Sequence, residues 1–136
     1  MTPLPHWAEG SAAVLAVGGP HAIPISTALR AADDRILFAL GARRRTLELL
    51  RDDPRAALCL MAEGAAFTAH GRATVIREPL EAVPLAALEL RVETVQDHLA
   101  DGRTEMLAAP GWRWTSEKAA GGDRAVREEL RRLAAG

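Results

Sequence analysis

The sequence contains very little of what builds disulfides, metal centres or membrane spans. Cys59 is the only cysteine in 136 residues, so no disulfide can form within the chain, and we expect a buried thiol that packs as a small apolar group. The four histidines are far apart in sequence and give no support for a Cys/His metal site. No apolar run approaches the roughly 20 residues of a transmembrane helix. Residues 1–10 do not resemble a signal peptide, and we therefore expect a cytoplasmic protein.

The charge of the chain is also close to balanced. The formal net charge is −1, whereas proteins that bind nucleic acids usually carry a clear basic surplus, so we expect neither a nucleic-acid nor a membrane partner. Sixteen of the 17 basic residues are arginine, whose planar guanidinium suits phosphate and carboxylate groups. The length fits a single domain over residues 1–136 that can bury a real core.

Alternating apolar residues predict six β-strands. Phe67–Ile76 alternates most cleanly, and Gly71 in its middle indicates a bulge or a close backbone approach. The expected strands are 12–17, 22–30, 35–40, 55–61, 67–76 and 87–96. Because strands mostly follow strands, the pattern favours a mainly β, antiparallel barrel over a doubly wound α/β fold.

Two helices are expected beside these strands. A short helix of about two turns follows Gly41, with Leu47 and Leu50 on one face and Asp53-Pro54 after its end. A C-terminal amphipathic helix is expected over residues 123–133.

Three consecutive arginines, Arg43, Arg44 and Arg45, stand between a strand end and the start of the short helix. Cations are unfavourable near the positive end of a helix dipole, whereas an anion there is stabilised by the terminal N–H groups. Together with Thr46, the arginines would form a receptor for a phosphate group. The alternative is that they are solvated or paired with nearby acids such as Asp33, Asp34 or Glu48.

The segment HAIPISTALRAADDRILFALGARRRTLELLRDDPRAALCL, followed by FTAHGRATV, resembles the pyridoxamine-5′-phosphate-oxidase-like family of flavin-binding split barrels. The resemblance runs from about residue 12 to residue 96. It implies a six-stranded antiparallel split β-barrel with a short inserted helix and a C-terminal helix. It also implies a homodimer with two flavin sites at the interface between the subunits.

The same resemblance implies a set of cofactor contacts. The residues concerned are Pro24, Ser26 and Thr27 along the flavin ring and ribityl chain, Phe38 and Ala39 against the same ligand, Arg43, Arg44, Arg45 and Thr46 around the phosphate, and Trp114 late in the chain. Trp112 and Arg113 beside Trp114 are further candidates. The late arginine-rich substrate motif of true pyridoxamine-phosphate oxidases is not evident, so we do not expect vitamin B6 oxidation.

The expected function is therefore that of an FMN-dependent oxidoreductase acting on a small molecule of unknown identity. The flavin would carry the redox chemistry, so no protein nucleophile or acid/base pair is required and no catalytic residue is assigned. Three alternatives remain. They are a deazaflavin-dependent reductase, a module that binds flavin or haem without turnover, and a dimerisation module without a ligand.

Overall fold

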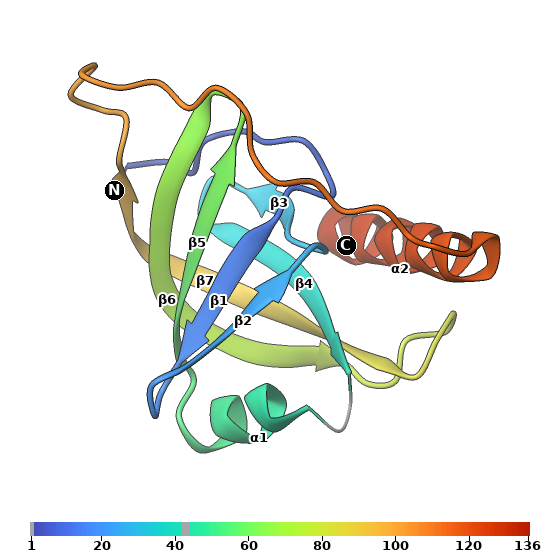
Figure 1. Ribbon diagram of the computed structural model, residues 1–136. Helices are drawn as coiled ribbons and strands as arrows, with labels where there is room; N and C mark the ends of the chain where they lie inside the picture. Colours follow the sequence, from blue (N-terminus) through green and yellow to red (C-terminus); the bar gives the residue numbers. More distant parts are fainter. Residues whose placement is uncertain (1, 42–43) are drawn as a thin grey trace.

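A computed structural model describes residues 2–41 and 44–136 and shows one curved antiparallel sheet with two helices (Figure 1). The predicted Arg43 lies outside the described residues. The strands are β1 (Ala13–Val17), β2 (His21–Ile25), β3 (Leu29–Ala32), β4 (Arg35–Gly41), β5 (Arg55–Ala62), β6 (Ala65–Arg77) and β7 (Leu85–Asp97), and the helices are α1 (Arg45–Asp52) and α2 (Glu117–Ala135).

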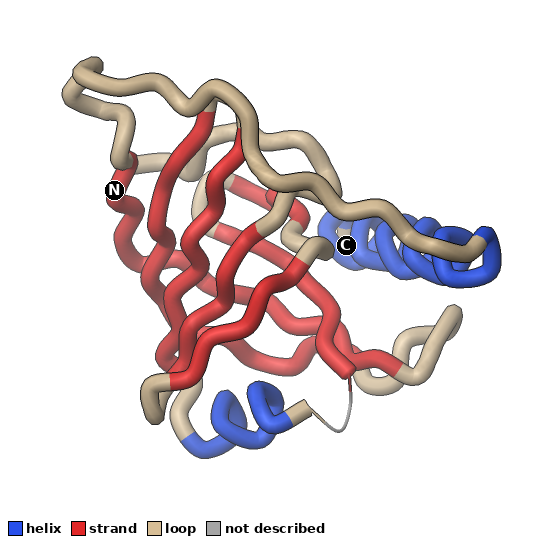
Figure 2. Tube along the Cα trace, in the orientation of Figure 1, coloured by secondary structure: helices blue, strands red, loops and turns tan. Residues whose placement is uncertain are grey.

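The sheet is a barrel that does not close. Its strand order is β2-β1-β5-β6-β7-β4-β3, and every pair of neighbours is antiparallel. The strands curl around a common interior, and β2 and β3 form the two edges (Figure 2). Since residues 26–28 alone connect these strands, the chain passes directly from one edge of the sheet to the other. The mainly β, antiparallel split-barrel prediction is confirmed.

The expected count of six strands is wrong by one, because the segment 22–30 is broken. β2 ends at Ile25 and β3 begins at Leu29. Between them, the indole N–H of Trp7 donates to the carbonyl of Ala28 at 3.0 Å, and the hydroxyl of Thr27 accepts from the N–H of Ala39 at 3.0 Å. These two hydrogen bonds fix the crossing segment, which has no hydrogen-bonded strand partner among the described residues.

The strand β4 is buried on both faces, which explains its continuous apolar sequence. Ile36, Phe38 and Leu40 point into the barrel core. Leu37 and Ala39 lie on the outer face, in a second cluster with Val126 and Leu130 of α2. Figure 1 shows α2 lying along the outside of the barrel beside β3 and β4.

The predicted close approach at Gly71 is confirmed. The pairing of β6 with β7 shifts register between His70 and Gly71. A Cβ atom at Gly71 would lie 2.0 Å from the carbonyl oxygen of Arg91, so only glycine allows the two backbones to come this close.

Cys59 is less buried than predicted, because it is only half-buried on the outer face of β5.

The C-terminal helix begins earlier than predicted, at Glu117, where the Ser116 hydroxyl caps it by accepting from the N–H of Ala119. In the described part of the chain, neither helix combines the length and apolarity needed to cross a bilayer.

Candidate functional site

Two groups of the predicted cofactor residues lie at the two ends of the edge strand β2. At its start, Nε2 of His21 lies 2.9 Å from the hydroxyl of Thr46 in α1. At its other end, the chain continues into Ser26 and Thr27. Five extended residues span roughly 16 Å, so the strand separates the basic end of the site from its hydroxyl-bearing end by about this distance.

The basic end is the N-terminus of α1. Arg44 occupies the N-cap position without a capping side chain, and both Arg44 and Arg45 are exposed. Arg45 contacts Glu48 at 3.0 Å, but both side chains are more than 60% exposed. Such a surface pair contributes only about 0–1 kcal/mol, so an anion can replace it at little cost. This end of the site therefore offers two accessible guanidinium groups at the positive end of a helix.

Thr46 lies differently from its neighbours in this cluster. Its side chain is buried, with 1% exposed, and its hydroxyl is bonded to the His21 ring. Thr46 thus joins α1 to β2, whereas Arg44 and Arg45 beside it in sequence are exposed.

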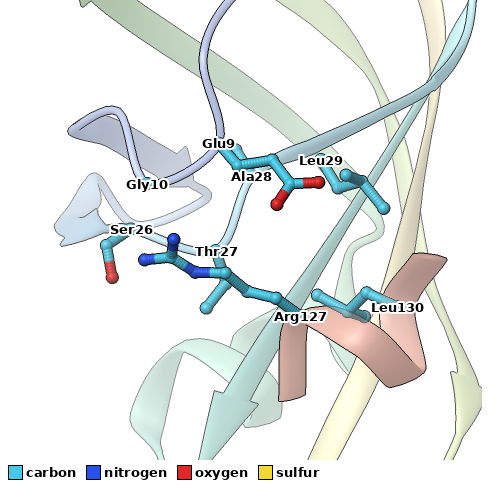
Figure 3. Close-up of a pocket in the computed structure, with 8 residues that line it drawn as sticks. All are labelled: Glu9, Gly10, Ser26, Thr27, Ala28, Leu29, Arg127 and Leu130. Carbon is cyan, nitrogen blue, oxygen red and sulfur yellow. The ribbon is translucent and has the colours of Figure 1, made fainter. Parts of the chain in front are cut away.

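The hydroxyl-bearing end of β2 borders a small hollow on the outside of the barrel. Its walls are formed by Glu9, Gly10, Ser26, Thr27, Ala28, Leu29, Arg127 and Leu130. Figure 3 shows the Arg127 side chain extending from α2 toward Gly10 and Ser26. The predicted residues Ser26 and Thr27 therefore face a hollow together with a cation that the sequence did not indicate.

The remaining strand residues of the predicted site are placed apart from this hollow. The Phe38 side chain is fully buried in the barrel core, and the Ala39 side chain lies under α2. Pro24 is exposed on the edge strand, opposite Val14 of β1. Of these three side chains, only Pro24 is accessible from outside.

Trp114 borders a second, larger hollow of about 800 Å³. This groove runs between residues 8–12, the end of β5 and residues 108–114 of the linker to α2. It shares Glu9, Gly10 and Arg127 with the hollow at Ser26 and Thr27, so the two adjoin. The linker crosses the end of the barrel opposite α1 (Figure 1). Trp114 thus borders a groove that adjoins the hollow of Ser26 and Thr27.

Arg127 is the charged group at the junction of the two hollows. One terminal nitrogen lies 2.8 Å from the buried carboxylate of Asp123, and its Nε is buried without a hydrogen-bond partner among the described residues. A Cβ atom at Gly10 would lie 3.0 Å from the guanidinium nitrogens. Glycine, here with a φ of +86°, thus allows Arg127 to lie against the N-terminal segment.

Glu9 completes the junction. The hydrogen bond from Arg131 is the main cause that lowers the pKa of Glu9 below its ordinary value, so the pair carries no net charge at neutral pH. Nothing local in the sequence links Glu9 and Gly10 to a helix more than a hundred residues later, which is why sequence reasoning missed them.

Most of the chain matches one known protein family. Residues 11–110 match the family described as Pyridoxamine 5′-phosphate oxidase, which is well over half of the chain. The chain belongs to this family. The pyridoxamine 5′-phosphate oxidase resemblance predicted from the sequence is therefore confirmed at the family level, whereas no curated protein matches the chain.

Solved structures similar to this family member share its fold at low identity. HupZ of Group A Streptococcus has a TM-score of 0.57 at 15% identity, covering 74% of this chain and 90% of its own. The General Stress Protein 26 of Bacillus anthracis has 0.53 at 13%, covering 65% and 84%. A heme binding protein of Mycobacterium smegmatis has 0.53 at 19%, covering 65% of this chain and 49% of its own. At these identities the likeness concerns the fold alone.

Proposed function

We propose that the protein is an FMN-binding oxidoreductase that holds the cofactor phosphate at the N-terminus of α1. The observation that carries the proposal is the pair of exposed guanidinium groups of Arg44 and Arg45 at a helix N-terminus that no described side chain caps. Without an anion, two cations at this position oppose the helix dipole, whereas a bound phosphate would turn the same arrangement into a favourable one.

Thr46 and His21 would position the phosphate site without contacting the phosphate through their side chains. Their hydrogen bond joins the first turn of α1 to β2, and it would thereby fix the position of Arg44 and Arg45 relative to the edge strand. The backbone N–H of Thr46 belongs to the first turn and would add to the donors around the phosphate.

The other end of the cofactor would lie toward Ser26 and Thr27. The Thr27 hydroxyl is held by the backbone of Ala39, whereas the Ser26 side chain is half-buried at the wall of the hollow. When bound, FMN would supply the hydride and electron chemistry, and the protein would supply its position and the charge around it.

We further propose that the protein forms a homodimer in which the second subunit completes the site. Among the described strands, β2 has a neighbour on one side only, and its exposed Pro24 and Ala22 leave the other side accessible. An unpaired edge beside a ligand site is a surface that a second subunit can cover.

Titration with FMN and with riboflavin tests the phosphate site, because riboflavin lacks the phosphate. The Arg44→Ala/Arg45→Ala variant is expected to lose at least tenfold in FMN affinity, since each charge-assisted hydrogen bond contributes about 1.5–3 kcal/mol. Its affinity for riboflavin should stay unchanged. Arg51→Ala, at the other end of α1, is the matched control and should bind FMN as the parent chain does. Equal FMN affinity in the double variant would refute the phosphate site.

Two other ligands are alternatives to FMN, and a separate titration tests each of them. A deazaflavin with an acidic tail could also use the arginines, and one structurally similar protein carries the name of a heme binding protein. Parallel titrations with FMN, deazaflavin and haemin, followed by reduction with a nicotinamide donor, distinguish these candidates. Reduction of bound FMN and its reoxidation by an acceptor is the expected result. Binding without either step would identify a non-catalytic module.

A further inference from the structure

The groove between the N-terminal segment, the end of β5 and the linker has an unusual aromatic wall. The chain has only three tryptophans and two phenylalanines. Phe38 and Phe67 are buried in the barrel core, and Trp7 packs on Phe67 with ring centres 5.3 Å apart. The two remaining aromatics, Trp112 and Trp114, are 52% and 50% exposed, and both line this groove.

The indole rings of Trp112 and Trp114 are available to a ligand. Within the part of the chain that the structure describes, the only aromatic pair is Trp7 with Phe67, so these two rings stack on no other ring. A tryptophan ring offers a large apolar surface and an electron-rich face that attracts cations. Met61, the third exposed large hydrophobic side chain among the described residues of the groove, is 43% exposed.

The charges of the residues that line the groove favour a cation. Glu9 is paired with Arg131, and Arg127 is paired with Asp123 at 2.8 Å, so neither pair adds net charge. Glu63, which is exposed at the turn between β5 and β6, forms no ion pair with any described residue. Among the residues that line the groove, Glu63 is thus the one charge that no described ion pair offsets. Arg113, between the two tryptophans in sequence, is exposed and also lacks a described ion pair, but it does not line the groove.

We propose that this groove binds a small organic cation of the quaternary or methylated ammonium class. The cation would lie against Trp112 and Trp114, and the carboxylate of Glu63 would balance its charge. An ordinary ammonium ion is strongly hydrated, whereas methyl groups replace that hydration with apolar surface that indole can cover. The groove lies away from the arginines of α1 but adjoins the hollow at Ser26 and Thr27 through Glu9, Gly10 and Arg127, and the proposal rests on the groove residues of the flavin-free chain.

Calorimetric titration of the cofactor-free full chain tests the proposal with three probes. Choline is the cation, 3,3-dimethylbutan-1-ol is its uncharged isostere of the same shape, and acetate is an anion. Choline is expected to bind about three- to thirtyfold more tightly than the isostere, which is the range for a cation on an indole face. Acetate should show no binding. Equal affinity for choline and the isostere, or no choline binding at all, would overturn the proposal.

Substitutions locate the site. Trp112→Leu, Trp114→Leu and Glu63→Gln should each weaken choline binding severalfold. Leu107→Ala and Glu105→Gln are the matched controls, because these exposed residues of the same linker do not line the groove. If the controls weaken binding as much as the groove variants do, the proposed site is wrong.

Sedimentation equilibrium distinguishes the remaining occupant, a second copy of the chain. The tryptophan variants should keep the oligomeric state of the parent protein. A dimer that dissociates in both variants would show that the groove is an interface between copies, which would contradict the proposal. Because FMN is absent throughout, failure of this proposal leaves the phosphate site untouched, and the reverse also holds.

Discussion

The hydroxyl of Thr46 lies 2.9 Å from Nε2 of His21 and joins the first turn of α1 to the first residue of β2. Thr46 is buried and His21 is half-buried, so the bond is partly shielded from water and joins the inserted helix to the edge of the sheet. The exposed Arg44 and Arg45 are carried by this helix. The position of the proposed phosphate site thus depends on a contact between residues 25 apart in sequence.

Thr46→Val removes that contact while preserving the shape of the side chain. We expect the free energy of unfolding to fall by about 1 kcal/mol, because the His21 ring loses its partner. FMN affinity should also fall if the arginines depend on the position of the helix. Chemical denaturation and FMN titration measure the two effects, and Thr46→Ser, which keeps the hydroxyl, should restore both. An unchanged stability in Thr46→Val would show that the bond does not hold α1.

Glu129 is a buried carboxylate whose partners are backbone amides. It accepts hydrogen bonds from the N–H groups of Glu81 at 2.9 Å and Ala82 at 3.2 Å, and so fastens α2 to the connection between β6 and β7. Glu129→Ala leaves both donors without a partner, and we expect the free energy of unfolding to fall by about 2–3 kcal/mol. The exposed neighbour Glu128 provides the control, since Glu128→Ala should change stability by less than about 0.5 kcal/mol.

Gly71→Ala should be among the most damaging small substitutions in the sheet. The new methyl group would lie 2.0 Å from the Arg91 carbonyl, and only a backbone shift can relieve that contact. We expect a loss of about 3 kcal/mol in the free energy of unfolding. Gly122→Ala in α2 meets nothing within 4 Å, and should instead add about 0.5–1 kcal/mol, because alanine favours helix. Thermal unfolding of both variants compares them directly.

The stability of the fold should decrease in acid. For Glu89, burial raises the pKa, but hydrogen bonds from Arg35 at 2.7 Å and Arg91 at 3.0 Å outweigh it, so the pKa lies below its ordinary value of 4.5. The hydrogen bonds from Arg55 likewise lower the pKa of Asp53 from 3.8 to about 2. Both carboxylates bind protons more weakly in the folded state than in the unfolded state. Their contribution to stability is therefore complete above about pH 5 and is lost as the pH falls through the folded-state pKa values.

Urea unfolding from neutral pH to about pH 3 measures this loss. In Glu89→Gln the decline between about pH 5 and pH 3 should be shallower, and stability at neutral pH should be lower because Arg35 loses its partner. Glu105→Gln, which changes an exposed carboxylate outside any described ion pair, should retain the slope of the parent chain. A slope that is the same in all three proteins would exclude Glu89 as a source of the acid sensitivity.

Local patterns in the sequence predicted most strands to within two residues, because alternation reports which side chains of a strand face the core. The break at residues 26–28 could not be predicted in this way. It depends on partners at Trp7 and Ala39 that only the folded chain brings near. The early start of α2 was missed because Gly121 and Gly122 interrupt the apolar periodicity that marked the helix after residue 123.

In the candidate site too, the residues that could be predicted from the sequence are neighbours along the chain, and those that could not are distant. Arg44 and Arg45 form a recognisable cluster because they are adjacent in sequence and stand before a helix. Arg127, Gly10 and Glu9 were not recognised, since their meeting depends on α2 packing against β3 and β4 on the outside of the barrel. The ion pair of Glu9 with Arg131 joins residues 122 positions apart.

The sequence by itself determined the mainly β class, the family resemblance and a cluster of cations before a short helix, since each depends on neighbouring residues. Only the tertiary structure decided that the barrel stays open between β2 and β3, that Thr46 faces inward to His21, and that two tryptophans share a groove with Glu63. These relationships join residues that are distant along the chain. They exist because burial of the two apolar clusters, one inside the barrel and one under α2, brings the chain together in one particular way.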